Sequence, residues 1–387
     1  MQIGDVFKVT RGDVLSMTLV HDERSAEASY PVYSSQTKKS GLSGYYSDFL
    51  YEDAITWTTD GANAGDVNYR SGKFYCTNVC GVLINTEGYA NPCVAALINS
   101  VSKSYVSYVG NPKLMNGVMV KIAIPFPTVK EQQKVADCLS SLDELIAAQV
   151  CKVDALKTHK KGLMQQLFPR EGETQPRLRF PEFRGPWEEA KLISLSDEPL
   201  SNGVFNDPKK VGAGYKLINV SDMYIDTAIN EARLLKLELS LSEFESKKVL
   251  RGDIFFTRSS LVKSGIAVSN IYLGNADDVT FDGHLIRFRL NFGKAVPLFA
   301  HYLFKTEPIR AQLIARGKSA TMTTIGQADV ASVTLLYPEK KEQQRIADCL
   351  TSLDHLITAA TQEHETFKTH KKGLMQQLFP SEEAVEA

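Results

Sequence analysis

Hydrophobic residues recur at alternating spacings of four and three along two long segments of the chain. The first segment carries them at Val135, Leu139, Leu142, Ile146, Val153, Leu156, Leu163 and Leu167. The second carries the pattern through Ile346, Leu350, Leu353, Ile357, Ala360, His364, Phe367, Leu374 and Leu378. This spacing is typical of a coiled-coil helix. Prolines flank both segments, at Pro127 and Pro169 and at Pro338 and Pro380. We therefore predict two helices of about 40 residues, each roughly 60 Å long.

The two helical segments are copies of one sequence. Residues 130–143 return as residues 341–354 with few changes, and residues 157–169 recur unchanged as residues 368–380. A helix with one apolar face must bury it, and a tethered copy has a high effective concentration, so pairing within the chain is favoured over two intermolecular zippers. Gln149, Lys160 and Lys371 interrupt the apolar face and are expected to help set the register. Antiparallel pairing places the two lysines at opposite ends, where they do not repel each other.

A long segment rich in β-branched and aromatic residues precedes each helix. The first is predicted to form strands at 3–10, 54–59, 74–84 and 118–124, with a helix near 94–108. The second is predicted to form strands at 214–220, 253–257, 265–272, 284–290 and 330–336, with helices near 298–305 and 309–315. The expected fold class is α+β, with two bodies of common fold separated by two long helices paired as an antiparallel coiled coil.

The expected boundaries follow from the repeat and from the prolines. They place a first body at 1–128, a long helix at 129–169, a connector at 170–186, a second body at 187–338, a second long helix at 339–380 and a tail at 381–387. Several prolines make the connector semi-extended. Its arginines, Arg177, Arg179 and Arg184, form either a docking or phosphate-contacting strip or a solvated loop.

Composition and charge narrow the class of protein. Over 387 residues, 43% hydrophobic and 23% charged content is that of a globular chain with two or three cores. The sequence has no apolar run of about 18 residues and no signal peptide at Met1, so the cytosol is the expected compartment and no membrane contact is expected. A net charge of -1 argues against nonspecific coating of nucleic acid, so DNA contacts would have to come from local clusters.

Polar, glycine-rich loops in both bodies carry side chains suited to nucleic acid. Such side chains donate and accept hydrogen bonds, as recognition of phosphates and base edges requires. Taken singly, each loop is also ordinary surface. The candidate contacts in the first body are Gln36, Lys38, Lys39, Asn63, Arg70, Lys73, Asn78 and Lys113. Those in the second body are Arg258, Ser259, Lys263, Lys318, Thr321 and Thr323.

Catalytic signatures are missing from the sequence. Gly317-Lys318-Ser319 lacks the first glycine of a phosphate-binding loop, because Gln312 stands in its place, and neither a GxSxG elbow nor an HExxH pair occurs. Cys76 and Cys80 are interpreted as small buried hydrophobic residues rather than zinc ligands. We therefore expect no active site, no metal and no cofactor in this chain.

The repeated motifs resemble the DNA-specificity subunits of type I restriction-modification systems, and the resemblance spans the whole chain. It rests on Lys130-Glu131-Gln132-Gln133 and Lys341-Glu342-Gln343-Gln344 at the starts of the helices, and on Lys-Gly-Leu-Met-Gln-Gln-Leu-Phe-Pro at their ends. The connector at 176–187, Tyr30-Pro-Val-Tyr-Ser-Ser and Trp57-Thr-Thr-Asp-Gly-Ala-Asn are also similar to the family. One departure is that Ile3-Gly-Asp-Val-Phe lacks the short Trp-containing lead that family members have before it.

The resemblance implies a noncatalytic reader of double-stranded DNA. It also implies two methyltransferase subunits as partners, which methylate adenine with S-adenosylmethionine, and ATP- and Mg-dependent restriction subunits that the complex can recruit. Two unlike bodies on a spacer imply a bipartite, asymmetric target with half-sites about 10 bp apart. The partner-docking candidates are Lys130, Glu131, Gln132, Gln133, Lys341, Glu342, Gln343 and Gln344. The alternatives are a coiled-coil scaffold that binds only protein partners and an enzyme whose site the sequence does not reveal.

Overall fold

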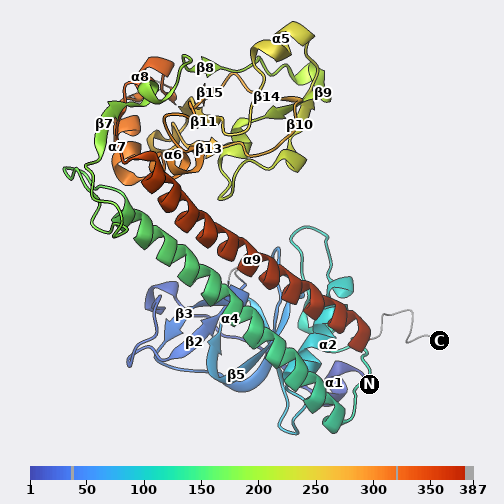
Figure 1. Ribbon diagram of the computed structural model, residues 1–387. Helices are drawn as coiled ribbons and strands as arrows, with labels where there is room; N and C mark the ends of the chain where they lie inside the picture. Colours follow the sequence, from blue (N-terminus) through green and yellow to red (C-terminus); the bar gives the residue numbers. More distant parts are fainter. Residues whose placement is uncertain (36–38, 320, 380–387) are drawn as a thin grey trace. The chain divides into compact units, whose positions relative to one another are not determined.

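The computed structural model describes residues 1–35, 39–319 and 321–379 and divides into two compact units. Unit 1 contains residues 1–151 and the described residues from 361 onward, and unit 2 contains residues 152–360. The division falls inside two long helices, α4 (Val129–Leu167) and α9 (Lys340–Leu378). Each unit therefore holds one body and a portion of both helices (Figure 1). The prolines and the apolar spacing predicted both helices to within two residues at each end.

Unit 1 is built on one six-stranded sheet, drawn in blue in Figure 1. Its order is β1-β6-β4-β5-β2-β3, and all neighbours are antiparallel except β2 and β5. The strands are β1 (Lys8–Arg11), β2 (Tyr30–Tyr33), β3 (Leu42–Tyr46), β4 (Tyr51–Thr58), β5 (Val67–Cys76) and β6 (Cys80–Ile84). Helices α1 (Ile3–Val6), α2 (Pro92–Ser102) and α3 (Asn116–Met119) complete this body.

Unit 2 repeats this strand order in two pieces. The orders are β8-β15-β11-β13 and β14-β9-β10. Strand β14 is parallel to β9, as β5 is parallel to β2 in unit 1, and the other neighbours in these orders are antiparallel. The strands are β8 (Ser201–Asn202), β9 (Val211–Ile218), β10 (Leu235–Leu237), β11 (Ile254–Thr257), β13 (Ser269–Ile271), β14 (Val279–Phe281) and β15 (Leu285–Phe288). Strand β5 of unit 1 thus corresponds to β13 and β14 with a break between them, and the two bodies share a common fold.

The remaining elements of unit 2 surround these sheets. They are β7 (Glu188–Lys191), α5 (Leu241–Ser246), β12 (Ser259–Ser260), α6 (Pro297–Leu303), α7 (Glu307–Ala315), β16 (Lys318–Ser319), β17 (Thr323–Thr324), α8 (Gln327–Ala331) and β18 (Thr334–Tyr337). Strand β18 pairs with β7 and leads directly into α9. The body and the long helix are therefore joined without a flexible linker, because only Pro338 and Glu339 lie between them.

Each unit has a separate hydrophobic core that includes residues of the long helices. In unit 1, Ala136, Leu139 and Phe379 join the buried cluster, and in unit 2 Ile346 and Leu350 do so. The core of unit 1 is dense around Trp57, whose indole Nε1 donates to the Leu114 carbonyl at 2.9 Å. A Cβ at Gly81 would lie 2.1 Å from the Trp57 ring, so only glycine fits there.

The two long helices pair in antiparallel orientation within each unit. In unit 2, Lys160 Nζ lies 2.5 Å from Asp354 Oδ1, and in unit 1 Lys371 Nζ lies 2.6 Å from Asp143 Oδ1. Lys160 and Lys371 are equivalent positions of the two copies, and so are Asp143 and Asp354. The lysine of each helix therefore pairs with the aspartate of the other. Gln149 also donates to Glu363 at 2.7 Å in unit 1. The predicted antiparallel pairing is confirmed, and each polar interruption of the apolar face has an acidic partner.

Several predicted strands are wrong in extent or type. Residues 3–6 form helix α1, and only 8–11 form a strand. Residues 116–119 form helix α3 instead of the start of a strand at 118–124, and 327–331 form α8 ahead of β18. Short helical turns with apolar residues every two to four positions cannot be told from strands by spacing alone. The segment predicted as one strand at 74–84 is divided by a tight turn into β5 and β6, which lie on opposite sides of β4 in the sheet.

Candidate nucleic-acid interface

Several candidate contacts of unit 2 and one of unit 1, Lys113, lie where a central strand of each body ends. Strand β4 leads to Thr59 and strand β11 leads to Arg258. The backbone amide of Leu114 donates to the Thr59 carbonyl and that of Ile325 donates to the Arg258 carbonyl, both at 2.9 Å. Thr59 and Arg258 therefore occupy the same place in the common fold, with different side chains.

A small antiparallel sheet follows that place in unit 2. Ser259 pairs with Thr324 and Lys318 pairs with Thr324, so β12, β17 and β16 bring together three candidate residues that are distant in sequence: Ser259, Lys318 and Thr323. Unit 1 has only single bridges at the corresponding positions, where Lys113 pairs with Asp60 and with Ser107. The two bodies therefore present the same backbone support with different side chains.

In unit 2 this edge is basic. Arg258, Lys263, Lys318 and Thr321 are exposed, whereas the Thr323 side chain is buried. Leu261 is 82% exposed and Val262 61% exposed, so the loop between Arg258 and Lys263 presents apolar side chains beside the cations. A cationic surface with exposed apolar tips suits the phosphate backbone and the faces or methyl groups of bases.

In unit 1 the corresponding edge is nearly neutralised. Asp60 lies 3.3 Å from Arg11 Nη2 and 3.9 Å from Lys113 Nζ, and Arg11 also donates to Thr59 Oγ1 at 3.0 Å. Sequence reasoning missed Arg11, because the predicted strand ended at Thr10. The sequence did carry a sign of it, because a polar, glycine-containing segment with a cation, Arg11-Gly12-Asp13, directly follows that predicted strand. Two cations around one carboxylate leave a local excess of one positive charge.

The other candidates of unit 1 are scattered. Lys39, Lys73 and Asn78 are exposed, and the Lys73 ammonium lies 4.5 Å from the centroid of the Phe49 ring. Asn63 is half-buried, and its carbonyl accepts from the Asp66 amide in a turn. Gln36 and Lys38 lie outside the described residues.

The expectation that Arg70 reaches nucleic acid needs correction. Its side chain is buried, donates to Thr56 Oγ1 at 3.0 Å and to the Ser40 carbonyl at 2.7 Å, and lies 3.7 Å from the centroid of the Tyr33 ring. Burial lowers its pKa. A buried guanidinium is stable here because its donors are satisfied. Arg70 therefore ties Ser40 to Thr56 of β4, and its sequence context of polar residues gave no sign of this.

Three of the eight partner-docking candidates are also corrected, because they are buried. Gln132 donates to the Pro127 carbonyl at 2.8 Å and accepts from Asn91 Nδ2 at 2.8 Å. Gln343 donates to the Pro338 carbonyl at 2.8 Å and accepts from the Val296 amide at 2.9 Å. These two glutamines therefore fasten each long helix to its own body. The third buried residue, Glu342, accepts two hydrogen bonds from Arg179.

The five other docking candidates are exposed: Lys130, Glu131, Gln133, Lys341 and Gln344. Gln133 donates to Asp137 at 2.7 Å and Gln344 donates to Asp348 at 2.8 Å, which are equivalent pairs one helical turn apart. The first turn of each long helix thus has an inner face that binds its own body and an outer face that is open. Two of the three connector arginines are paired, Arg177 with Glu173 and Arg179 with Glu342, both at 2.7 Å, and Arg184 is exposed.

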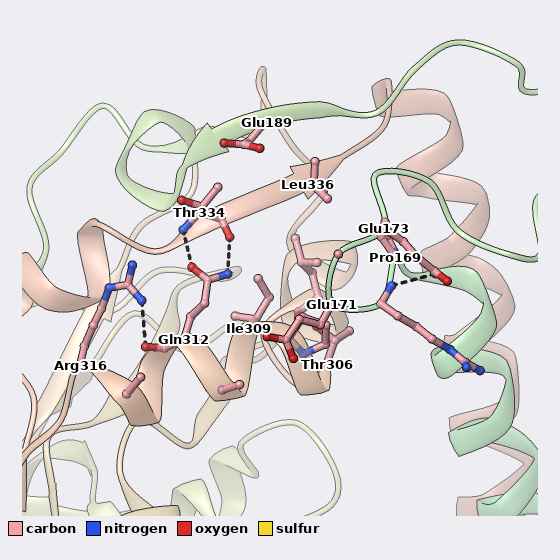
Figure 2. A pocket seen from close by; sticks show the side chains of 16 residues that line it. Pro169, Glu171, Glu173, Glu189, Thr306, Ile309, Gln312, Arg316, Thr334 and Leu336 are labelled. Atoms are coloured by element: carbon pink, nitrogen blue, oxygen red, sulfur yellow. Dashed lines mark hydrogen bonds between the residues drawn. The ribbon is translucent and has the colours of Figure 1, made fainter.

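A cavity of about 430 Å³ in unit 2 does not belong to this interface. Figure 2 shows it between α7, the β7 and β18 strands and the turn after α4. Gln312 fixes one wall by accepting from the Thr334 amide at 3.0 Å and donating to the Thr334 carbonyl at 2.9 Å. The lining is mainly apolar and includes Glu171, Glu173 and Glu189. Arg170 and Arg316 also line it, so three carboxylates outnumber two guanidinium groups and do not favour a polyanion such as DNA.

Two negative findings apply to the described ranges. Within residues 1–35, 39–319 and 321–379, no group of three or more His, Cys, Asp or Glu residues is arranged to hold a metal ion. Over the same ranges, every helix is too short or too polar to cross a membrane, including α4 and α9.

Comparisons with known proteins point to one family. Residues 1–153 match the family model described as a type I restriction modification DNA specificity domain. A type I specificity subunit N-terminal protein of Mycoplasma pneumoniae is 36% identical over 143 residues, which cover 36% of this chain and 75% of that protein. The MjaVIII type I restriction enzyme specificity subunit of Methanocaldococcus jannaschii is 23% identical over 396 residues, covering 98% of this chain and 91% of the relative.

A solved structure shows the same fold. The crystal structure of the type I restriction-modification S subunit from M. genitalium aligns with a TM-score of 0.62 at 13% sequence identity, covering 98% of this chain and 96% of that one. Because the identity is low, this likeness concerns the fold alone, which comprises mixed helix-and-strand bodies and two long helices.

Proposed function

Because the chain belongs to the family of type I restriction-modification DNA specificity subunits, we propose that it reads a bipartite, asymmetric DNA target, one half with each body. Recognition of DNA is the family's shared property, and the division into two half-sites is the proposal. The observation that carries it is the common strand order of the two bodies combined with unlike side chains at the same place, Thr59 in one and Arg258 in the other. One fold with two sets of contacts suits two different sequences.

The two long helices are proposed to set the spacer between the half-sites. Each is a continuous 39-residue helix that is fastened to its own body by Gln132 or Gln343. A helix fixed to a body at one end transmits a defined length of about 1.5 Å per residue. The spacer would then depend on helix length and not on the loops that read the bases.

Methyltransferase subunits are proposed to dock on the outer face of the first helical turn, where Lys130, Glu131 and Gln133 of α4 and Lys341 and Gln344 of α9 are exposed. Since both copies present nearly the same side chains, two identical partners fit. The partners would carry the chemistry: adenine methylation with S-adenosylmethionine after the base is flipped out of the duplex, and, where restriction subunits join, the use of ATP and Mg. Within this proposal the chain itself holds no cofactor.

The test is methylome sequencing of cells that express this chain with its methyltransferase subunit. The expected result is methylated adenine in a two-part motif with an unread gap. Exchanging residues 1–128 for another first body should change one half of the motif and leave the other half and the gap unchanged. A change in both halves would contradict the assignment of one half-site to each body.

A triple variant separates this function from a scaffold that binds only protein. Arg258→Ala, Lys263→Ala and Lys318→Ala remove three exposed cations of unit 2. The partner-bound complex should lose DNA affinity, and the dependence of affinity on salt should weaken, because each lost phosphate contact reduces the slope by about one. Lys209→Ala with Lys210→Ala is the control, since both lysines are exposed in the same body. Equal DNA affinity for triple variant and control would favour the scaffold.

A further inference from the structure

A second cavity of unit 2, of about 570 Å³, is lined by positive charge on several elements. Lys157 and Lys160 come from α4, Lys305 follows α6, and Arg310 lies on α7. The acidic residues in the lining are Asp226 and Asp354. This cavity shares no residue with the basic edge formed by Arg258, Lys263 and Lys318, so it is a separate feature of the unit.

The charges in this cavity are unequally paired. Lys160 is held by Asp354 at 2.5 Å, and Asp354 also accepts from Tyr302 at 2.7 Å. Lys157 lies 3.6 Å from Asp226, whose side chain is 94% exposed, which makes that ion pair weak. One carboxylate is therefore already shared by two donors, and the other is in solvent.

Arg310 is occupied by the fold. Its guanidinium donates to the carbonyls of Ser264, Ile266 and Ala267, the last of which has a φ of 48°. The arginine thus stabilises an unusual backbone turn and contributes only its net charge to the cavity.

Lys305 has no hydrogen-bond or ion-pair partner for its ammonium among the described residues. Burial, with a smaller contribution from the charge of Lys160, lowers its pKa to about 8. Asp354 and Asp226 act in the opposite direction without reaching bonding distance. His301 on α6 is buried, and burial lowers its pKa well below the usual value, so it adds no charge at neutral pH. A half-buried cation without a counter-charge favours an anion beside it.

Ser269 provides an independent indication of a ligand. It begins strand β13, only 2% of its surface is exposed, and it lines the cavity. Its Oγ is buried and has no hydrogen-bond partner within the described part of the chain. A buried hydroxyl without a partner is unfavourable, since buried polar atoms normally have a partner in the protein or in a bound water, so an acceptor beside Ser269 Oγ would be stabilising.

We propose that this cavity binds a phosphate-class oxyanion, with Lys305 and Ser269 as hydrogen-bond donors and Lys157 supplying further positive charge. A tetrahedral oxyanion offers several acceptor atoms in different directions, which matches donors that come from a strand, a helix end and α4. A carboxylate offers its acceptor sites in one plane, which suits donors from three different elements less well. The binding itself does not depend on the proposed function. Two sources supply this chemistry: a phosphate of a DNA backbone and a free phosphate ion.

The first experiment measures inorganic phosphate binding to the full chain by calorimetry at neutral pH. Wild type should bind at millimolar or lower concentration, and Lys305→Met and Ser269→Ala should each weaken binding about tenfold or more, because each removes a hydrogen bond to a charged group. Lys209→Met is the control, since it removes an exposed lysine of the same unit. Circular dichroism confirms that each variant is folded. No binding to wild type, or equal binding to the control and both variants, would overturn the proposal.

A second probe tests whether the Lys305 charge is involved. Sulfate keeps its charge from about pH 6 to 9, whereas Lys305 loses its proton through this range. Sulfate affinity of wild type should fall as the pH rises above 8, and Lys305→Met should show weak affinity without that fall. A fall of equal size in the variant would assign the titration to another group and remove Lys305 from the site.

The source of the phosphate is decided with the partner-bound complex and a DNA duplex. If a backbone phosphate occupies the cavity, inorganic phosphate competes with DNA and Lys305→Met lowers the salt slope of DNA binding by about one. If a free ion is the ligand, phosphate binds without affecting DNA affinity. Both results support the anion site, and the calorimetry on the chain alone stays informative even where the complex does not bind DNA.

Discussion

Glu131 and Glu342 occupy the same position in two copies of one helix, yet their surroundings differ. Glu342 is fully buried and accepts from Arg179 at 2.8 and 2.7 Å, whereas Glu131 is exposed. The neighbouring glutamines, Gln132 and Gln343, behave alike, because each binds the carbonyl of a preceding proline. A repeated sequence therefore gives repeated structure only where its neighbours are repeated. The connector covers Glu342 in unit 2, and this makes one glutamate structural and leaves the other at the surface.

The largest expected effect comes from breaking the Arg179–Glu342 pair. Arg179→Ala leaves a buried carboxylate without a partner and should lower the stability of unit 2 by about 3 kcal/mol. Trp187 lies in unit 2 and Trp57 in unit 1, so urea unfolding followed by fluorescence in a Trp57→Phe background reports unit 2 alone. The matched change, Glu131→Ala, should alter stability by no more than about 0.5 kcal/mol. Similar losses for both variants would mean that the connector does not distinguish the two helix starts.

A second expected effect concerns Lys305, a half-buried cation whose charged form is destabilised by partial burial. Its folded pKa of about 8 is below the usual 10.5, so the unfolded chain holds the proton more tightly. The penalty is complete below about pH 8, declines as the pH rises and vanishes above 10.5, and a shift of this size corresponds to roughly 3 kcal/mol. Lys305→Met should therefore stabilise unit 2 near pH 7 by about 2 to 3 kcal/mol, and the gain should shrink with rising pH.

Thermal unfolding of Lys305→Met and wild type across this pH range provides the measurement. Lys209→Met serves as the control because its ammonium is exposed. A gain that stays constant with pH would show that the effect comes from packing of the new side chain and not from removal of a strained charge.

The smallest expected effect is a difference in stability between variants of the two lysine–aspartate pairs of the long helices. In unit 2 the Lys160 side chain is 17% exposed and Asp354 33% exposed, whereas in unit 1 Lys371 is 25% and Asp143 59% exposed. Because exposed pairs are screened by solvent, Lys371→Met should cost less than about 0.5 kcal/mol and Lys160→Met about 1 kcal/mol. Hydrogen exchange of the two helix segments measures both. A larger loss for Lys371→Met would reverse this order.

The sequence predicted the helices well because their signals are local. The proline boundaries, the apolar spacing and the polar interruptions at Gln149, Lys160 and Lys371 can each be recognised within the sequence of one helix. In the structure each of these three polar side chains binds an acidic residue of the other long helix. Short strands were harder, and β2, β3 and β10 were not predicted. Strand β3 contains one serine and one glycine among its five residues, so its sequence resembles that of a polar loop.

The site was harder to predict because burial is a property of the fold. Arg70 lies in a polar stretch of the sequence. Its contacts with Thr56, Ser40 and Tyr33 form only in the folded sheet, because these residues are distant from it in sequence. Likewise, nothing near Glu342 in sequence indicates Arg179, which is 163 residues away. Residue type identified which side chains could bind an anion, and only tertiary contacts showed which of them were already occupied.

The reciprocal lysine–aspartate pairs restrict the helices to a single alignment. Sliding one helix past the other by one heptad would preserve most apolar contacts, because the pattern repeats. It would also move Lys160 from Asp354 to Ala347 or Thr361, and Lys371 from Asp143 to Ala136 or Val150. Both ammonium groups would lose their carboxylates in one step. Any natural lengthening or shortening of this element must therefore add or remove residues in both copies, because a change in one copy alone would misplace one of the two charge pairs.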